Sequence, residues 1–140
     1  MIDKVLFLDI DGVLNSNKSI DLAIYLEPGR IKLLNNIIEQ TKCEVVISST
    51  WRLENGPLQL EKLLTQAGYK WYILGYTPAI PDRERGTEIK VWLARHPTQK
   101  FVILDDNDDM GNLFPYLVKT TSDEGLTEAK TQEVIKKFNE

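Results

Sequence analysis

The sequence is poor in the residues from which disulfide and zinc frameworks are built. Its 140 residues include one cysteine, Cys43, and one histidine, His96. A single cysteine excludes an internal disulfide and a cysteine-based metal site, and a free cysteine commonly behaves as a small buried hydrophobe. We therefore expect Cys43 to fill a buried position at the start of a strand. We expect His96 to lie at a helix end, where the helix dipole favours an imidazolium.

The sequence also lacks long apolar runs and an excess of positive charge. No run approaches the ~20 residues of a membrane span, and the N-terminal residues do not follow the basic, apolar and small-residue order of a secretory signal. With 17 basic and 21 acidic residues, the formal net charge is -4, which opposes a general polyanion-binding surface. We expect a cytoplasmic protein with no membrane partner and no obligate protein partner.

What the sequence does contain is an alternation of short apolar runs and amphipathic segments. Apolar runs predict strands at residues 5–8, 45–47, 71–74, 101–104 and 116–118. Helical spacing predicts helices at residues 30–42, 57–67 and 127–138, and one more that is capped by Thr87 and ends before Pro97. The charged segment 82–86 predicts an exposed loop. Such alternation is typical of a parallel-sheet α/β fold, here a single domain over residues 1–140.

The ends of three predicted strands carry side chains that can bind metal or react. These side chains are Asp9 and Asp11, Ser48 and Ser49, and Asp105 and Asp106. In an open α/β sheet, ligands bind outside the carboxyl ends of the strands. Side chains that are far apart in the sequence are therefore expected to converge on one crevice.

These residue types suit the hydrolysis of a phosphate monoester. The substrate is a dianion, and Mg2+ held by Asp9 and Asp105 would offset its repulsion of an anionic nucleophile. Asp9 is then able to attack phosphorus and form an aspartyl-phosphate. Asp11 is the candidate general acid and base, and Ser48 is the candidate donor to a phosphoryl oxygen.

Further candidates are expected to contact the substrate. A cation is needed against the developing negative charge, and both Arg85 and Lys90 qualify. Arg85 is favoured because it precedes the predicted helix, whereas Lys90 lies within it. Ser49 is a second candidate hydroxyl, and Arg52 either holds the substrate phosphate or pairs with a neighbouring carboxylate. We expect the three tryptophans to be core residues, and we question this only for Trp51, which adjoins Ser48–Thr50.

At this point the residues resemble a known family. Residues 8–15 are similar to the first motif of the haloacid dehalogenase (HAD) superfamily, Ser48 after Val-Val-Ile to its second, and Asp105-Asp106 to its acidic fourth. Segments 48–52, 85–93 and 125–127 are similar to HAD domains linked to RNA repair. Those domains in turn resemble the phosphatase domain of polynucleotide kinases.

The resemblance implies a three-layer, Rossmann-like fold with a mainly parallel sheet. It also implies Mg2+ held by Asp9, by the acidic pair Asp105-Asp106 and by the backbone carbonyl of Asp11. Asp109 either ligates the metal or hydrogen-bonds within its loop. The implied substrates are phosphate monoesters, with the terminal phosphates of nucleotides or nucleic acid among them. The gaps at residues 15–28 and 52–85 are too short for a full cap domain, so an open site is predicted.

Two non-catalytic functions compete with a phosphatase. A receiver-type module that binds Mg2+ and a phosphoryl group places its acceptor aspartate after the third strand of the sheet. Here no aspartate follows residues 45–47, and residues 71–74 lead into Gly-Tyr-Thr. The other alternative is a degenerate HAD scaffold that binds a protein, and the intact set of Asp9, Asp11 and Asp105 speaks against it.

Overall fold

The computed structural model describes residues 1–81 and 83–140, so Asp82, in the predicted exposed loop, lies outside the described residues. One five-stranded parallel sheet has the order β3-β2-β1-β4-β5. Its strands are β1 (Ile2–Leu8), β2 (Glu44–Ile47), β3 (Gly75–Tyr76), β4 (Thr98–Asp105) and β5 (Leu117–Lys119). The helices are α1 (Asn17–Asp21), α2 (Pro28–Thr41), α3 (Trp51–Glu54), α4 (Pro57–Gln66), α5 (Arg85–Arg95) and α6 (Glu128–Asn139), with a 3-10 helix η1 (Gly111–Tyr116).

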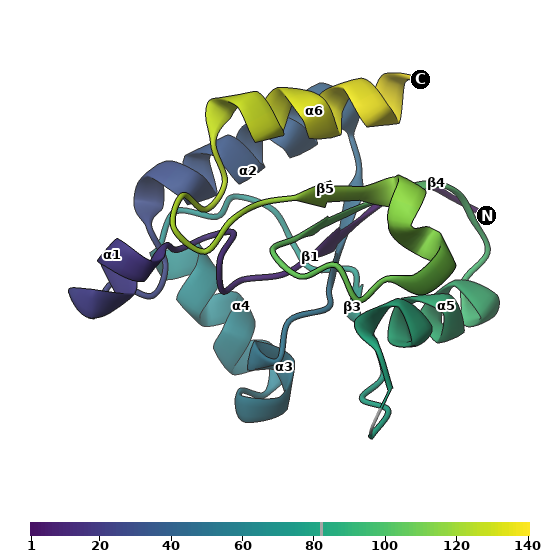
Figure 1. The fold of residues 1–140 in the computed structure, drawn as a ribbon, viewed down its shortest axis with the longest axis horizontal. Coiled ribbons are helices and arrows are strands. Elements are labelled where there is room, and N and C mark those ends of the chain that lie inside the picture. The colour runs from purple at the N-terminus through teal and green to yellow at the C-terminus, as the bar shows by residue number, and fades with distance from the viewer. Residues whose placement is uncertain (82) are drawn as a thin grey trace.

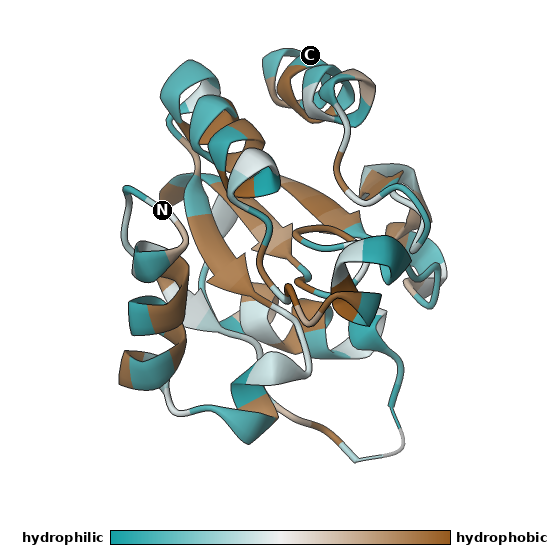
Figure 2. Ribbon diagram, turned by 90° about the vertical axis from the view of Figure 1, so that its left-hand side faces the viewer, coloured by the Kyte–Doolittle hydropathy of each residue, from teal (hydrophilic) through white to brown (hydrophobic). Residues whose placement is uncertain are grey.

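The apolar runs form the central strands because a parallel sheet is covered on both faces. In β1, Val5 and Phe7 belong to one hydrophobic cluster, and Leu6 and Leu8 belong to another. Successive residues of a strand point to opposite faces, so the two clusters lie on the two sides of the sheet. Figure 2 shows the hydrophobic strands enclosed by helices of mixed hydropathy.

Helices cover each face of the sheet. The cluster that contains Leu8 takes core residues from α2, α4 and α6, whereas the cluster that contains Phe7 takes them from α5 and η1. Helices α2 and α6 contact each other and run side by side, with α5 on the opposite side of the sheet (Figure 1). The predicted α/β class and its three-layer, Rossmann-like arrangement are confirmed.

The third predicted strand is misplaced. The apolar run at residues 71–74 precedes the strand, which is the two-residue edge strand β3. The chain first aligns with β2 at Leu74, whose N–H donates to the carbonyl of Val45 at 2.8 Å. Trp71 is 38% exposed, which also makes its assignment to the core wrong, whereas Trp92 is buried. Periodicity alone could not separate an apolar approach to the sheet from the strand itself.

Helix α5 begins three residues before the predicted start. Its N-cap is Glu84, not Thr87. The N–H of Arg85 donates to Oδ2 of Asp109 at 3.1 Å, and the N–H of Gly86 donates to the carbonyl of Asp109 at 3.0 Å. These bonds satisfy donors that the first turn of a helix leaves free, and their acceptor is distant in the sequence.

Neither predicted gap holds a further domain in the described parts of the chain. The first gap contains the short helix α1, and the second contains α4 and β3, which belong to the core and to the sheet. The predicted absence of a full cap domain is thus confirmed. Among the described residues, none of the helices has the length and apolar character needed to cross a membrane.

Two glycines test how closely α5 packs on its neighbours. Gly86 and Gly29 are the second residues of α5 and α2. A Cβ at Gly86 would lie 2.4 Å from the backbone oxygen of Met110, whereas a Cβ at Gly29 would have nothing within 4 Å. We expect Gly86→Ala to lower the free energy of unfolding by ~1–3 kcal/mol and Gly29→Ala to raise it by ~0.4–1 kcal/mol. Urea unfolding measures both, and equal effects would contradict the close contact at Gly86.

Candidate active site

The carboxyl ends of β1, β2 and β4 lie side by side and bring three polar segments together. Leu8 pairs with Ile47 of β2 and with Leu104 of β4. Backbone bonds extend this pairing by one residue. The N–H of Ser48 donates to the carbonyl of Leu8, and the N–H of Asp9 donates to that of Leu104, each at 3.0 Å. The residues that follow these strands therefore share one edge of the sheet.

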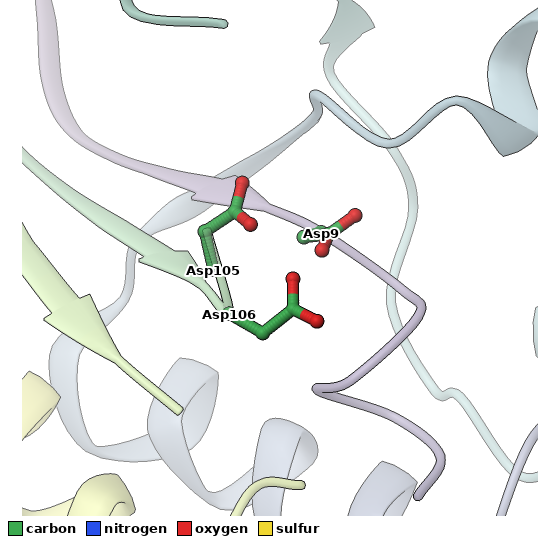
Figure 3. A group of neighbouring side chains, drawn as sticks. All are labelled: Asp9, Asp105 and Asp106. Carbon is green, nitrogen blue, oxygen red and sulfur yellow. The ribbon is translucent and has the colours of Figure 1, made fainter. Parts of the chain in front are cut away.

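Three carboxylates meet at this edge. Asp9, Asp105 and Asp106 each offer an oxygen atom, and these atoms lie within 4.8 Å of one another. Figure 3 shows Asp9 just beyond β1 and the other two at the end of β4, with their carboxylates gathered around a common space. Hard oxygen donors that repel one another at this separation suit a divalent cation such as Mg2+. The carboxylate of Asp11 is not part of this group.

Burial and mutual repulsion act on the two innermost carboxylates. Burial, followed by the charge of Asp105, raises the pKa of Asp9 from its ordinary value of 3.8 to about 9, and Arg85 opposes the rise. Burial also raises the pKa of Asp105, again against Arg85. Nη1 of Arg85 lies 3.2 Å from Oδ1 of Asp9 and 2.7 Å from Oδ2 of Asp105. One guanidinium thus partly balances two buried carboxylates, and a second cation would favour their charged forms further.

Asp11 is held in different surroundings, at the exposed rim of the site. Its Oδ1 accepts a hydrogen bond from Nδ2 of Asn15 at 2.9 Å and another from the indole Nε1 of Trp51 at 3.1 Å. Asn15 is fully buried and is held in turn, since its Oδ1 accepts from the N–H of Gly12 and its Nδ2 also donates to the carbonyl of Tyr25. These bonds fix the position of the carboxylate that is the candidate acid and base.

Asn15 and Trp51 are site residues whose contacts with Asp11 we did not predict. Asn15 is the last residue of the segment that resembles the first motif, and no role of its own is predicted for it from the sequence. The sequence feature that could have identified Asn15 is its position as a polar residue directly after the apolar pair Val13-Leu14. The sequence predicts a core position for Trp51 but leaves it in question because Trp51 adjoins Ser48–Thr50, and in the structure its side chain is partly buried.

Gly12 allows the turn after β1 to approach the carboxylate cluster. Its φ is +78°, a conformation that favours glycine. A Cβ at this position would lie 2.1 Å from Oδ2 of Asp106. The carbonyl of Gly12 accepts a hydrogen bond from Oγ1 of Thr120 at 2.6 Å. The loop after β5 therefore braces the turn that carries Asp11.

The two predicted serines differ in what they contact. The hydroxyl of Ser48 is buried and has no hydrogen-bond partner among the described residues. Such an unpaired buried hydroxyl is uncommon, and its capacity to donate a hydrogen bond is unused. The hydroxyl of Ser49 is also buried and accepts from the N–H of Trp51 at 3.2 Å, so it helps to begin α3.

Arg52 pairs with a neighbouring carboxylate, one of the two roles left open by the sequence. Nη2 of Arg52 lies 2.9 Å from Oε1 of Glu88, and both side chains are largely buried. Its remaining N–H groups donate to the backbone carbonyls of Ser48, Ser49, Thr77 and Pro78. Arginine has five N–H donors, so this arrangement leaves none for a substrate phosphate.

The two candidate cations of α5 have different positions. Arg85 is the first residue of the helix and contacts Asp9 and Asp105, whereas Lys90 is exposed one turn later. Asp109 accepts the bond that begins α5, and it does not belong to the group of three carboxylates. Oδ2 of Asp109 is therefore engaged at the start of α5, whereas its buried Oδ1 has no hydrogen-bond partner among the described residues.

Removing each cation separately tests which one serves the carboxylates. In metal-free buffer at pH 8, we expect Arg85→Met to lower the free energy of unfolding by ~3–5 kcal/mol. The buried Asp105 would lose the counter-ion whose Nη1 lies 2.7 Å from its Oδ2. Lys90→Met in the same helix is expected to change it by less than ~0.5 kcal/mol. Urea unfolding of both variants measures this, and a small effect of Arg85→Met would contradict the electrostatic role.

Comparison with known proteins identifies a family for this chain. The family model of the HAD domain in Swiss Army Knife RNA repair proteins matches residues 5–131. That span contains the ends of β1, β2 and β4 and the start of α5, and thus all the residues described at this edge of the sheet. No curated protein and no solved structure matches the chain.

Proposed function

The chain belongs to the family of HAD domains in Swiss Army Knife RNA repair proteins, and from this premise we propose that it is a Mg2+-dependent phosphatase of phosphate monoesters. The observation that carries the proposal is the group formed by Asp9, Asp105 and Asp106, with Arg85 in contact with two of them. A dianionic substrate requires positive charge where it binds. A cluster of oxygen ligands beside a buried arginine is suited to provide it.

In the proposed reaction, Asp9 is the nucleophile. Its carboxylate oxygen bonds to phosphorus while the bond between phosphorus and the ester oxygen breaks. Asp11 gives its proton to the departing oxygen, so the alcohol leaves neutral. In the second step, Asp11 takes a proton from water as the water oxygen bonds to phosphorus. The bond to Asp9 then breaks, and inorganic phosphate leaves.

Other residues prepare the site for a charged phosphoryl group. Mg2+ would be held by the carboxylates of Asp9, Asp105 and Asp106 and the carbonyl of Asp11, and when bound it supplies positive charge that orients the group and offsets repulsion. Arg85 adds a second positive charge. The unpaired hydroxyl of Ser48 supports its proposed role as a donor to a phosphoryl oxygen.

The substrate is tested by measuring phosphate release from a panel of esters. The panel contains nucleotides, sugar phosphates and oligonucleotides with a 5′ or 3′ terminal phosphate, each with Mg2+ and with chelator. We expect release that requires Mg2+ and is greatest for nucleotides or nucleic-acid ends. Turnover of sugar phosphates alone would exclude the nucleic-acid hypothesis. Raised melting temperatures with Mg2+ and phosphate, without turnover of any ester, would favour a non-catalytic phosphoryl-binding module.

A further inference from the structure

A groove of about 800 Å3 opens at Asp11, and the three-carboxylate group is not part of its lining. Its walls come from α1, the segment before α2, α3 and α4. Figure 1 shows these helices grouped on one flank of the molecule, away from α5 and η1. Two aromatic side chains, Tyr25 and Trp51, line the groove together with apolar residues such as Leu26 and Leu63. The groove is thus a concave, largely apolar surface with a catalytic candidate at its edge.

Both aromatic residues are connected to Asp11 by hydrogen bonds. Nε1 of Trp51 donates directly to Oδ1 of Asp11 at 3.1 Å. Nδ2 of the buried Asn15 donates to the same Asp11 oxygen and to the carbonyl of Tyr25, each at 2.9 Å. The walls of the groove and the candidate acid and base are therefore parts of one hydrogen-bonded unit. Whatever lies in the groove lies against the group that is proposed to protonate the departing oxygen.

The lining restricts the chemistry of an occupant. Its charged side chains among the described residues are Asp11 and Glu54, both acidic. An anionic group is therefore disfavoured within the groove, whereas a flat, uncharged aromatic group can stack on Tyr25 or Trp51. Asn55 and Gln66 also line it and add amide groups that can hydrogen-bond to the edge of such a ring. The volume lies within the ~300–1,000 Å3 typical of small-molecule sites.

We propose that this groove is the subsite for the leaving group, and that it takes the aromatic base of a nucleoside whose phosphate is cleaved at the carboxylate cluster. The proposal rests on the phosphatase function, because Asp11 must touch the departing oxygen and so places the leaving group on its own side. The nucleoside is either free or the last residue of a nucleic-acid strand. In both cases the acidic lining keeps any further phosphate outside the groove.

The first experiment measures selectivity. kcat/KM is determined for a nucleoside monophosphate and for glycerol phosphate, and their ratio is compared in wild type, Tyr25→Leu and Tyr72→Leu. Tyr72 is 64% exposed and does not line the groove, so it is the matched control. We expect Tyr25→Leu to lower the ratio about 10-fold, the typical effect of losing one stacking contact with a base, and Tyr72→Leu to leave it unchanged. An unchanged ratio in Tyr25→Leu overturns the proposal.

A second experiment tests whether the nucleoside is part of a free nucleotide or of a nucleic-acid end. The same nucleotide is offered free and at the phosphorylated 3′ end of an oligonucleotide. Preference for the free form identifies mononucleotides, and preference for the strand identifies nucleic-acid ends. Both outcomes support the groove if the preference over glycerol phosphate depends on Tyr25.

A binding experiment separates this proposal from the phosphatase function. Adenosine, which carries no phosphate, is titrated into 15N-labelled protein, and the indole N–H resonance of Trp51 is followed after assignment with Trp51→Phe. We expect this resonance to shift with adenosine and not with glycerol. If it shifts while no ester is hydrolysed, the nucleoside site stands and the phosphatase function fails. If esters are hydrolysed and it does not shift, the groove assignment fails and the phosphatase function stands.

Discussion

Replacing Asp9 with asparagine is expected to abolish Mg2+-dependent phosphate release while leaving the protein folded. The amide has nearly the same shape, but it has no anionic oxygen to attack phosphorus and is a poor metal ligand. Loss of a catalytic nucleophile typically lowers kcat by on the order of 10⁴-fold or more. Steady-state phosphate release with the best substrate of the panel measures the loss, and turnover at the wild-type rate would exclude Asp9 as the nucleophile.

The same substitution has an expected signature in stability. The pKa of Asp9 is raised from 3.8 to about 9 in the folded protein, mainly by burial and then by Asp105. Between these pH values the unfolded chain ionises this carboxyl while the folded protein resists its ionisation, so this group lowers the stability of the metal-free protein as pH rises. In chelator, Asp9→Asn should therefore melt higher than wild type, and by more at pH 8 than at pH 5.

Added Mg2+ is expected to reverse this order. Ligand that binds the folded state raises its stability, so wild type should gain melting temperature with Mg2+ and Asp9→Asn should gain much less. Asp108→Asn is the matched control, because Asp108 is exposed in the loop after β4 and lies outside the carboxylate group. It should behave as wild type in both melting and turnover. An equal response of all three proteins to Mg2+ would contradict metal binding by Asp9.

Replacing Asp11 with asparagine is expected to slow both chemical steps. General acid–base catalysis typically contributes about 10²–10⁴-fold, and an amide can neither give nor take the proton. The amide oxygen can still accept the hydrogen bonds from Asn15 and Trp51 that hold Asp11 in place. The substitution therefore removes the proton transfer and preserves the position of the side chain.

The choice of ester separates the two steps. With an alkyl phosphate, the departing oxygen needs a proton, and formation of the aspartyl-phosphate should be slow in Asp11→Asn. With an aryl phosphate whose phenolate leaves without protonation, the first step should be less affected and the second should limit the rate. A burst of phenol release, close to one per protein molecule, is then expected. Asp3→Asn, an exposed change at the start of β1, is the control. Wild-type rates in Asp11→Asn would remove its role as acid and base.

Much of the site could be placed from the sequence because its residues follow apolar strands. The runs before Asp9, Ser48 and Asp105 are long enough to predict parallel strands, and parallel strands present their carboxyl ends at one edge. Residues at the ends of neighbouring strands must then lie close together. The grouping of Asp9, Asp105 and Asp106 follows from this rule, and so does the position of Ser48 beside them.

The contacts of Arg52 and Asn15 could not be predicted in the same way. The partners of Arg52 include Glu88 of α5 and the carbonyl of Thr77, and those of Asn15 include the carbonyl of Tyr25. Each of these contacts depends on how a loop or helix packs against a distant segment. A local pattern therefore left Arg52 with two equal roles and Asn15 with none.

The sequence by itself determined the order of the five strands and of the four longer helices, the α/β class and the three strand ends at which polar side chains follow apolar runs. Only the tertiary structure decided that Arg85, not Lys90, contacts the carboxylates, that α5 begins at Arg85, and that Trp51 reaches Asp11 from the wall of a groove. The physical reason is the range of the interactions. Hydrophobic periodicity is a property of neighbouring residues. By contrast, the hydrogen bond between Arg85 and Asp109 joins residues 24 positions apart, and the one between Trp51 and Asp11 joins residues 40 positions apart.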